Sequence, residues 1–316
     1  MQNGPGSGGA RGMSANYAID VRYYRLSEPL QPYFTALYAF EFDAGPGQAI
    51  EDWLHPEWSQ MRFVWGAPPR ARVGPGALSE QWPFVASGPT SRSIHFQLTR
   101  GKSWGLGLQP AGWAKFADGP ASVVADMTVD GSSHPAFALF APIGRMLRPD
   151  EPDLDTFASR INDFLMQHIE CPASGGDIVM ACHEALRDPD VATVTAWAER
   201  VGLELRSLER LCLRFFGFPP KMLLRRQRFL RSLSRFMLHD ASSWSSAMDG
   251  QYHDQAQFVR DFRAFMGMTP SEYAERPHPI IGRTMAQRMA DHGIVPQTDL
   301  PTILRYGAAS GAKAGR

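Results

Sequence analysis

The sequence contains a repeat whose two copies lie 50 residues apart. Residues 208–220 align with residues 258–270 without a gap, and apolar residues occupy the same positions in both copies. An internal repeat constrains the architecture before any single residue is interpreted. Each copy has the pattern of an amphipathic helix that ends at a glycine, with a proline shortly after it. The identical pairs are Arg210 and Arg260, Phe215 and Phe265, Gly217 and Gly267, and Pro220 and Pro270.

A shorter helical stretch precedes each copy of the repeat. Residues 194–201 lead into the first copy with Trp197 and Ala198 on one face, and Gly202 supplies the turn. Two helices joined by a short turn that contains glycine form a helix-turn-helix unit. The sequence therefore predicts an all-α region with two such units, whose usual ligand is duplex DNA.

The basic residues are concentrated in one stretch, although the whole chain has no net charge, with 32 basic and 32 acidic residues. Residues 206–235 hold nine basic side chains and one acidic side chain, Glu209. This stretch therefore carries a charge of about +8, and the rest of the chain carries about −8. A solvated helix face is one interpretation. The coincidence with the repeat favours the other, which is contact with DNA phosphates.

The N-terminal half has a different composition. Residues 1–16 are rich in Gly, Ser and Pro and are expected to be disordered. Residues 17–150 hold six of the eight tryptophans, and several short strands separated by Gly/Pro turns predict a β-rich sandwich or barrel. The predicted fold class is α+β, with this β-rich domain followed by the all-α domain. The predicted strands are 34–42, 61–65, 93–98 and 122–129.

A connecting helix and a Gly-rich linker are predicted for residues 151–176, between the two domains. Apolar residues recur on one helix face from Leu154 to Ile169. This pattern favours packing on the domain core, and a homodimer contact is the alternative. Residues 177–277 are assigned as the DNA-binding domain, and residues 278–316 as a C-terminal tail.

The second helix of the first unit carries polar side chains off its apolar stripe, where a recognition helix faces the major groove. Arginine can bond guanine O6 and N7 together, and glutamate can accept from cytosine N4. Ordinary solubilising charge is the alternative, above all for Glu209. The candidate DNA contacts here are Arg206, Ser207, Glu209, Arg210 and Arg214, with Arg225 and Arg226 on the following helix.

Two motifs flank a long predicted linking helix at residues 222–238. The first motif spans Ala198–Pro220, and the second spans Tyr252–Tyr273 and ends in Phe265-Met266-Gly267-Met268-Thr269-Pro270. Together they resemble the DNA-binding domain of the AraC family of bacterial transcription regulators. The resemblance implies two helix-turn-helix units that read adjacent major-groove segments on one face of the DNA.

The resemblance also implies which positions read bases. In the first unit these are Arg206, Glu209 and Arg210. Glutamine suits bidentate bonding to adenine, and the alanine methyl group can touch a thymine methyl. The positions implied in the second unit are Gln255, Ala256, Gln257 and Arg260.

Two residues of the second unit depart from the family pattern. Ser246 stands where an aliphatic residue is usual, and Gln251 stands where the turn glycine is usual. A serine in the core and a side chain at a turn with positive φ would both weaken the unit. We expect weaker DNA recognition by this unit with its fold kept, because Trp244 can repack the gap.

Residues 105–113 resemble a strand and turn of the cupin-like effector domains that precede such units. Cupin enzymes hold a metal with closely spaced histidines and a carboxylate, whereas His55, His95 and His134 are isolated in the sequence. No catalytic residue, metal site or cofactor is predicted. The abundant aromatic residues and the lack of a basic cluster predict a pocket for a small apolar effector.

These observations predict a sequence-specific DNA-binding transcription regulator, not an enzyme, controlled by a small molecule in its N-terminal domain. Double-stranded DNA is the expected partner, together with a second copy of the chain, and RNA polymerase is a further candidate. Three cysteines without metal spacing, the lack of a signal peptide and the lack of a membrane-length apolar run predict a cytoplasmic protein. The alternatives are a ligand-independent regulator whose barrel only dimerises, and a cupin-type enzyme.

Overall fold

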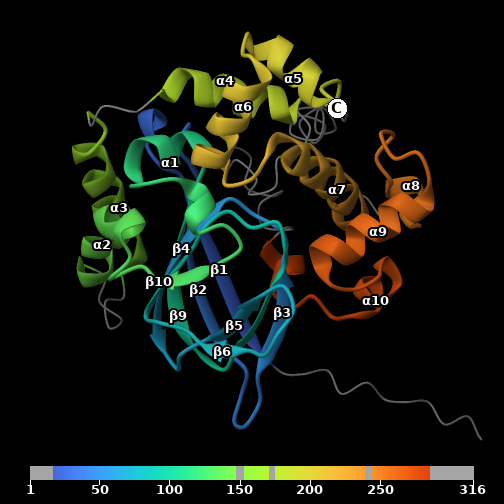
Figure 1. The fold of residues 1–316 in the computed structure, drawn as a ribbon. Coiled ribbons are helices and arrows are strands. Elements are labelled where there is room, and N and C mark those ends of the chain that lie inside the picture. Colours follow the sequence, from blue (N-terminus) through green and yellow to red (C-terminus); the bar gives the residue numbers. More distant parts are fainter. Residues whose placement is uncertain (1–16, 147–152, 171–174, 239–242, 285–316) are drawn as a thin grey trace, which may run out of the picture.

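The computed structural model has a β-rich N-terminal domain and a C-terminal domain made of helices (Figure 1). This arrangement confirms the predicted α+β class. The predicted disorder at residues 1–16 and the predicted tail from residue 285 onward lie outside the described residues. The structure describes residues 17–146, 153–170, 175–238 and 243–284.

Two antiparallel sheets form the N-terminal domain. The larger sheet has the strand order β1-β2-β9-β4-β7-β10, and the smaller one has the order β3-β8-β5-β6. The predicted strands at 34–42, 61–65 and 93–98 are present as β2, β4 and β8. The strands are β1 Ala18–Tyr24, β2 Phe34–Asp43, β3 Ile50–Leu54, β4 Ser59–Gly66, β5 Arg70–Val73, β6 Ser79–Glu80, β7 Phe84–Ser87, β8 Ile94–Leu98, β9 Arg100–Leu108 and β10 Thr128–Asp130.

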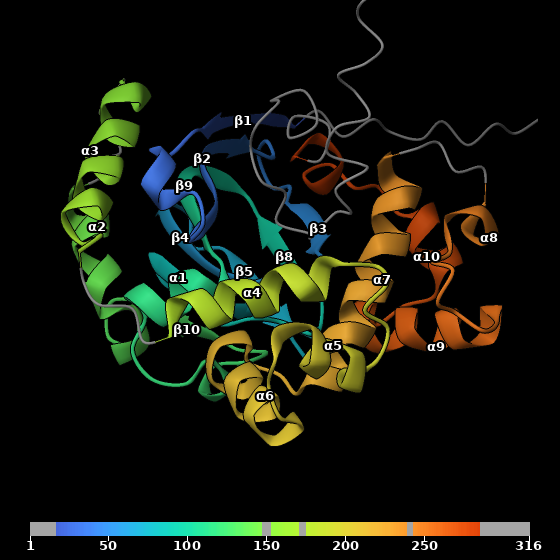
Figure 2. The same cartoon turned by 90° about the horizontal axis from the view of Figure 1, so that it is seen from above.

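Successive side chains of a strand point to opposite faces, so the larger sheet contributes to two cores. Its outer face packs against helices α1 (Pro110–Phe116), α2 (Ala141–Met146) and α3 (Leu154–Gln167), which lie beside it in Figures 1 and 2. Phe157 and Ile161 of α3 belong to this core, so the apolar stripe of the connecting helix packs on its own domain. The space between the sheets holds the second core, Phe40, Phe42, Ala44, Ile50, Ala71, Ile94, Phe96, Leu98 and Ile280.

The predicted strand at residues 122–129 is wrong over most of its length. A 3-10 turn, η2 (Ala121–Val123), and a bend occupy this segment, and only β10 at its end pairs with β7. Asp126 has a positive φ of 56° that a strand cannot accommodate. Its carboxylate accepts hydrogen bonds from Ser91, which holds the bend, and the neighbouring Val124 packs into the core without pairing in a sheet.

Helices make up the described part of the C-terminal domain. The repeat glycines Gly217 and Gly267 both end a helix in the left-handed conformation, with φ of 84° and 74°. This geometry explains why the repeat requires glycine there. The helices are α4 Gly176–Arg187, α5 Val194–Val201, α6 Leu205–Leu211, the π turn η4 Cys212–Phe216, α7 Pro220–Leu238, α8 Trp244–Ala247, α9 Gln255–Met266 and α10 Pro270–Glu275.

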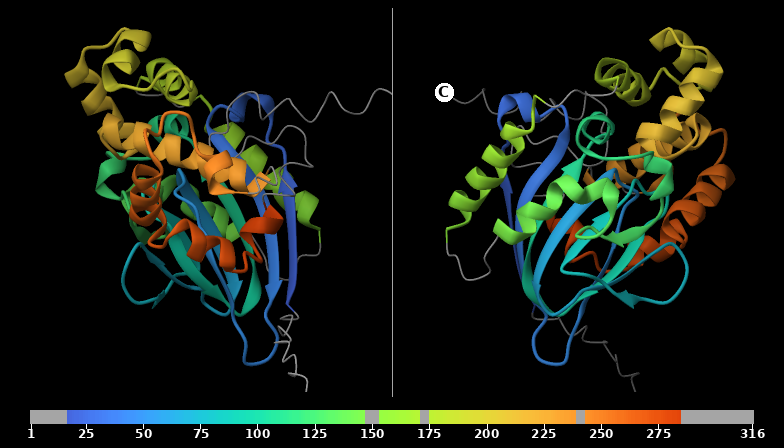
Figure 3. Two further views of the ribbon diagram at one scale, coloured as in Figure 1. Left: turned by 90° about the vertical axis from the view of Figure 1, so that its right-hand side faces the viewer. Right: turned by 60° about the vertical axis from the view of Figure 1, so that its left-hand side comes forward.

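The two domains share hydrophobic cores. Trp58 and Ala111 of the N-terminal domain pack with the first helix-turn-helix unit, and Trp53 packs with the second. Ser93 donates from its backbone N–H to the Phe265 carbonyl at 2.7 Å. The helices of the C-terminal domain therefore lie along the top and one side of the barrel that the two sheets form, as Figures 1 and 3 show.

Candidate DNA-binding interface

The first helix-turn-helix unit is built from α5, the turn at Gly202 and α6. Thr193 caps α5 by accepting from the Ala196 backbone N–H at 3.1 Å, and Trp197 is fully buried.

Burial raises the pKa of the Cys182 thiol to about 12, and it also raises the pKa of Cys212. Both thiols are therefore protonated and unreactive at neutral pH, and they serve as core residues.

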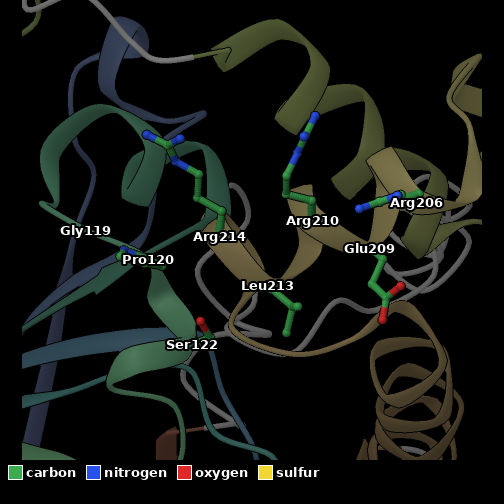
Figure 4. A pocket seen from close by; sticks show the side chains of 8 residues that line it. All are labelled: Gly119, Pro120, Ser122, Arg206, Glu209, Arg210, Leu213 and Arg214. Carbon is green, nitrogen blue, oxygen red and sulfur yellow. The ribbon is translucent and has the colours of Figure 1, made fainter.

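The charged side chains predicted to read DNA share one surface. Figure 4 shows Arg206, Glu209, Arg210 and Arg214 projecting from α6 and η4, with residues 119–122 of the N-terminal domain across from them. These residues line an open groove of about 600 Å³. All four are exposed, and in the described part of the chain no ion pair engages any of the three arginines. Ser207 is half-buried on the same helix.

The second unit presents a matching helix. Asp254 caps α9, with its side chain accepting from the Gln257 N–H at 2.6 Å. Gln255, Ala256 and Arg260 are exposed on its first turns. The two helices predicted to read DNA, α6 and α9, lie on the same side of the molecule, along the lower edge of Figure 2.

Gln257 differs from its neighbours on α9. Its side-chain carbonyl accepts from the His253 backbone N–H at 3.2 Å. This bond holds the amide back over the start of the helix, in the manner of a capping box. Gln255 is therefore better placed than Gln257 to extend into a major groove.

The expectation that Ser246 and Gln251 weaken the second unit is wrong in both of its premises. Ser246 is exposed and takes no part in the core. Trp244 is half-buried and packs against the core instead, with its ring centroid 3.6 Å from that of Phe236. Among the described residues Asp126 is the only non-glycine with positive φ, so Gln251 carries no backbone strain.

Gln251 makes contacts that a glycine could not make. Its side-chain carbonyl accepts from Arg231 at 3.0 Å, and its amide nitrogen donates to the backbone carbonyl of Pro189. Pro189 lies in the loop between α4 and α5, so Gln251 links the second unit to the first. The sequence indicated a departure from the family pattern but could not identify the partner 62 residues away.

Four of the arginines on α7 form ion pairs inside the domain, with two carboxylates that offset two of their four charges. Two buried aspartates, Asp249 and Asp261, are the acidic partners in these pairs. These pairs compete with phosphate contacts of the four arginines, but Arg225 and Arg235 keep 36% of their side chains exposed, so the phosphate contact of Arg225 stays a prediction. The pairs are Arg231 with Asp249 at 2.7 Å, Arg235 with Asp249 at 3.9 Å, Arg225 with Asp261 at 2.5 Å and Arg228 with Asp261 at 3.0 Å.

Arg226 is the clearest correction among the predicted DNA contacts. Its side chain is 1% exposed, and its guanidinium lies 3.8 Å from the centroid of the Trp58 ring. It donates to the carbonyls of Thr90 at 2.9 Å and Glu57 at 3.4 Å. An arginine in this position joins the two domains and is not available to a phosphate.

A second candidate site lies between the two sheets of the N-terminal domain. An apolar cavity of about 110 Å³ is lined mainly by aromatic and aliphatic side chains of both sheets, among them Tyr38, Phe40 and Phe96. Polar side chains at its wall include Arg62 and Gln81. This geometry matches the apolar pocket that the aromatic composition predicts.

The charge of Arg62 is already compensated. Its guanidinium donates to the buried carboxylate of Glu57 at 2.6 Å. Burial lowers the pKa of Arg62, but the charge of Glu57 and the hydrogen bond to it outweigh burial and leave the pKa raised. The pair therefore remains ionised and mutually neutralised at the cavity wall.

The described residues hold no group of three or more His, Cys, Asp and Glu side chains that could bind a metal. The three isolated histidines of the N-terminal domain have other partners. His55 bonds the Tyr273 hydroxyl at 2.7 Å, His95 pairs with Glu51, and His134 accepts from a backbone N–H. No described helix is long and apolar enough to span a membrane.

Comparison with known proteins identifies the helical region. A protein-family model described as a helix-turn-helix domain matches residues 197–276, from within α5 to the end of α10. No curated protein matches the chain.

Several solved structures share part of the backbone arrangement. Apo ToxT from Vibrio cholerae is 10% identical, with 81% of this chain and 96% of ToxT aligned at a TM-score of 0.41. ToxT has also been solved bound to (E)-4-(8-methylnaphthalen-1-yl)but-3-enoic acid, at 10% identity, 81% and 97% coverage and a TM-score of 0.39. The AraC-like transcriptional activator CuxR is 14% identical, with 69% and 87% aligned at a TM-score of 0.27. At these TM-scores the superpositions add nothing to the assignment of the helical domain.

Proposed function

We propose that this chain, an AraC-type transcription regulator that binds DNA through its helix-turn-helix domain, reads its operator with α6 and α9 under the control of a small apolar effector. The effector site is the cavity between the two sheets. In the first unit, Arg206, Glu209 and Arg210 read bases. In the second unit, Gln255, Ala256 and Arg260 do so.

The observation that carries the proposal is the common placement of the two recognition helices. Both face the same side of the molecule, and both expose the polar residues that can bond base edges. The arginines of α6 differ from those of α7 because no described acidic side chain pairs with them. Their charge is therefore available to DNA.

Selection of duplex DNA from a random pool by the full-length protein tests this function. We expect an enriched sequence bound at roughly nanomolar affinity at physiological salt. Arg210→Ala should weaken binding to it by about 1–3 kcal/mol and relax base preference at one position. Recovery of no preferred sequence from the pool would exclude specific recognition.

Arg200→Ala supplies a matched control for the arginine of α6. Arg200 is exposed on α5 and pairs with Asp188 at 2.8 Å, outside the groove in front of α6. We expect this variant to keep the sequence preference of the wild type. If Arg210→Ala lowers affinity equally for all sequences, Arg210 contacts phosphate only.

The cavity supports effector control because it is apolar, enclosed by both sheets and in contact with the segment that follows α10. A ligand changes DNA binding only if it favours one of two arrangements of the domains. The shared cores described above provide the contacts through which such a preference acts.

The remaining features of the proposal follow from the role of such a regulator. We place the protein in the cytoplasm with its DNA, acting as a homodimer with RNA polymerase as a further partner. Sedimentation of the full chain with and without operator DNA tests the dimer. A monomer under both conditions would reject it.

A further inference from the structure

The segment that follows the DNA-binding domain is attached to the barrel. Residues 278–284, here called the latch segment, run from the end of α10 to the mouth of the cavity. Asp52 of β3, which is fully buried, accepts from the backbone N–H groups of Ile280 and Ile281, each at 2.9 Å. A buried carboxylate with two backbone donors is a strong anchor.

The latch segment fills part of the cavity. Ile280 and Ile281 are 5% and 8% exposed, and with Thr284 they form part of the cavity lining. The remaining volume is about 110 Å³. Pockets for drug-sized ligands measure about 300–1,000 Å³. A ligand of that size therefore fits only if part of the lining moves, and the two isoleucines belong to the part that lies outside the two sheets.

The latch segment is also continuous with the second helix-turn-helix unit. The His278 ring stacks on the Tyr273 ring with centroids 4.1 Å apart, and His278 contacts Asp52 at 3.2 Å. Tyr273 belongs to α10, and its hydroxyl bonds His55 of the barrel at 2.7 Å. Displacement of the latch segment therefore removes contacts that attach this unit to the barrel.

The cavity wall specifies the polarity of a ligand. Gln81 is buried and donates its amide N–H groups to the Ala71 carbonyl and to Ser79, while its side-chain carbonyl has no partner. This oxygen can accept a hydrogen bond from a ligand. The neighbouring Arg62 gives little attraction to an anion, because Glu57 already neutralises it.

We propose that the cavity takes a neutral apolar ligand with one hydrogen-bond donor, which bonds Gln81 and displaces Ile280 and Ile281. Ligand binding thereby loosens the second helix-turn-helix unit from the barrel. This inference rests on the proposed effector control and adds the ligand class and the route of coupling.

Three linear probes with eight carbons each test the ligand class by calorimetry on the full chain: 1-octanol, its isomer heptyl methyl ether, and octanoate. Octanol should bind about five- to tenfold more tightly than the ether, because only octanol donates to Gln81. Gln81→Met should remove this difference. Equal binding of octanol and the ether by the wild type, or tighter binding of octanoate than octanol, would reject the ligand class.

Hydrogen exchange of the latch segment tests the displacement directly. With saturating octanol, the backbone N–H groups of Ile280 and Ile281 should exchange at least about tenfold faster, because they lose Asp52 as acceptor. Unchanged or slower exchange with octanol bound would show that the latch segment stays in place. This result would overturn the coupling between the cavity and the second helix-turn-helix unit, but not the ligand class.

A double variant, Ile280→Ala with Ile281→Ala, checks the competition from the other side. It should bind octanol about tenfold more tightly than the wild type, because the ligand then displaces two small alanine side chains that bury less apolar surface in the cavity than the isoleucines do. Ile178→Ala on α4 is the control, because Ile178 does not line the cavity. If neither wild type nor double variant binds any probe, effector binding in the cavity is itself rejected, while DNA recognition stands on its separate selection experiment.

Discussion

The guanidinium of Arg226 lies over the ring of Trp58, 3.8 Å from its centroid, and joins the linking helix to the barrel. Both side chains are buried, and they belong to different domains. The contact makes α7 a part of the domain interface as well as a spacer between the two DNA-binding units. An effector that changes the barrel can therefore act on α7 without passing through a flexible linker.

Arg226→Ala should destabilise the protein without a specific effect on phosphate contacts. The variant leaves the carbonyls of Thr90 and Glu57 without this donor and opens a cavity beside Trp58, at a cost of about 2–4 kcal/mol. Urea denaturation measures the loss. The salt dependence of DNA binding should keep the wild-type slope, and a slope lower by about one would mean that Arg226 reaches a phosphate after all.

The contrast between Arg210 and Arg226 shows what the sequence could predict. Both are arginines in one basic stretch, and helical periodicity places Arg210 on the polar face of α6 as observed. The partners of Arg226 are 136 and 169 residues away along the chain, so no local pattern reveals them. The repeat predicts the helices and their glycine ends because these depend on local backbone geometry.

The latch segment is likewise held by a partner that is distant in the sequence. Its sequence has no strong periodicity and predicts only the start of a C-terminal tail. Its position depends on Asp52, which lies 228 residues before Ile280. A single buried carboxylate in a strand is a weak signal on its own, and only the fold brings its acceptor oxygens to the latch segment.

Asp249 should make the second helix-turn-helix unit sensitive to acid. Burial raises its pKa, but the hydrogen bond and charge of Arg231 outweigh burial and hold the pKa below its ordinary value. The unfolded state therefore binds the proton first as pH falls. The stabilisation is complete above the unfolded value of about 3.9 and is lost as pH falls through the lower folded pKa.

Denaturant titrations between pH 7 and pH 2 measure this effect. The free energy of unfolding of Asp249→Asn should be lower at pH 7 and should fall less steeply in acid than that of the wild type. Asp190→Asn, at an exposed position in the loop between α4 and α5, is the control and should keep the wild-type slope. Parallel curves for Asp249→Asn and the wild type would contradict the role of this carboxylate.

Replacement of the two glutamines of α9 should affect different properties of the protein, base preference in one variant and stability in the other. Gln255→Ala should relax base preference by about 1–3 kcal/mol at one position, because Gln255 is exposed at the start of the helix. Gln257→Ala should instead cost about 0.5–1 kcal/mol of stability, because its side chain bonds the His253 N–H. Binding titrations and thermal unfolding separate the two effects. Equal loss of base preference in both variants would show that Gln257 leaves its capping position on DNA.

The repeat offers a matched pair of glycines for testing the domain contact. Gly217 and Gly267 have φ of 84° and 74°, so alanine at either position costs about 1–2 kcal/mol of backbone strain. A methyl group at Gly267 would meet open space, whereas at Gly217 it would lie 3.1 Å from the Cγ atom of Pro89 in the N-terminal domain.

Gly217→Ala should therefore destabilise the protein more than Gly267→Ala, by an amount that reports on the contact between the first unit and the barrel. Chemical denaturation of both variants in the full chain measures the difference. Pro89→Ala removes the opposing Cγ atom but keeps Cβ at 3.3 Å, so it should lower the cost of Gly217→Ala part of the way toward that of Gly267→Ala. Equal costs in the presence of Pro89 would mean that this contact yields without strain, and that the first unit is free to shift against the barrel.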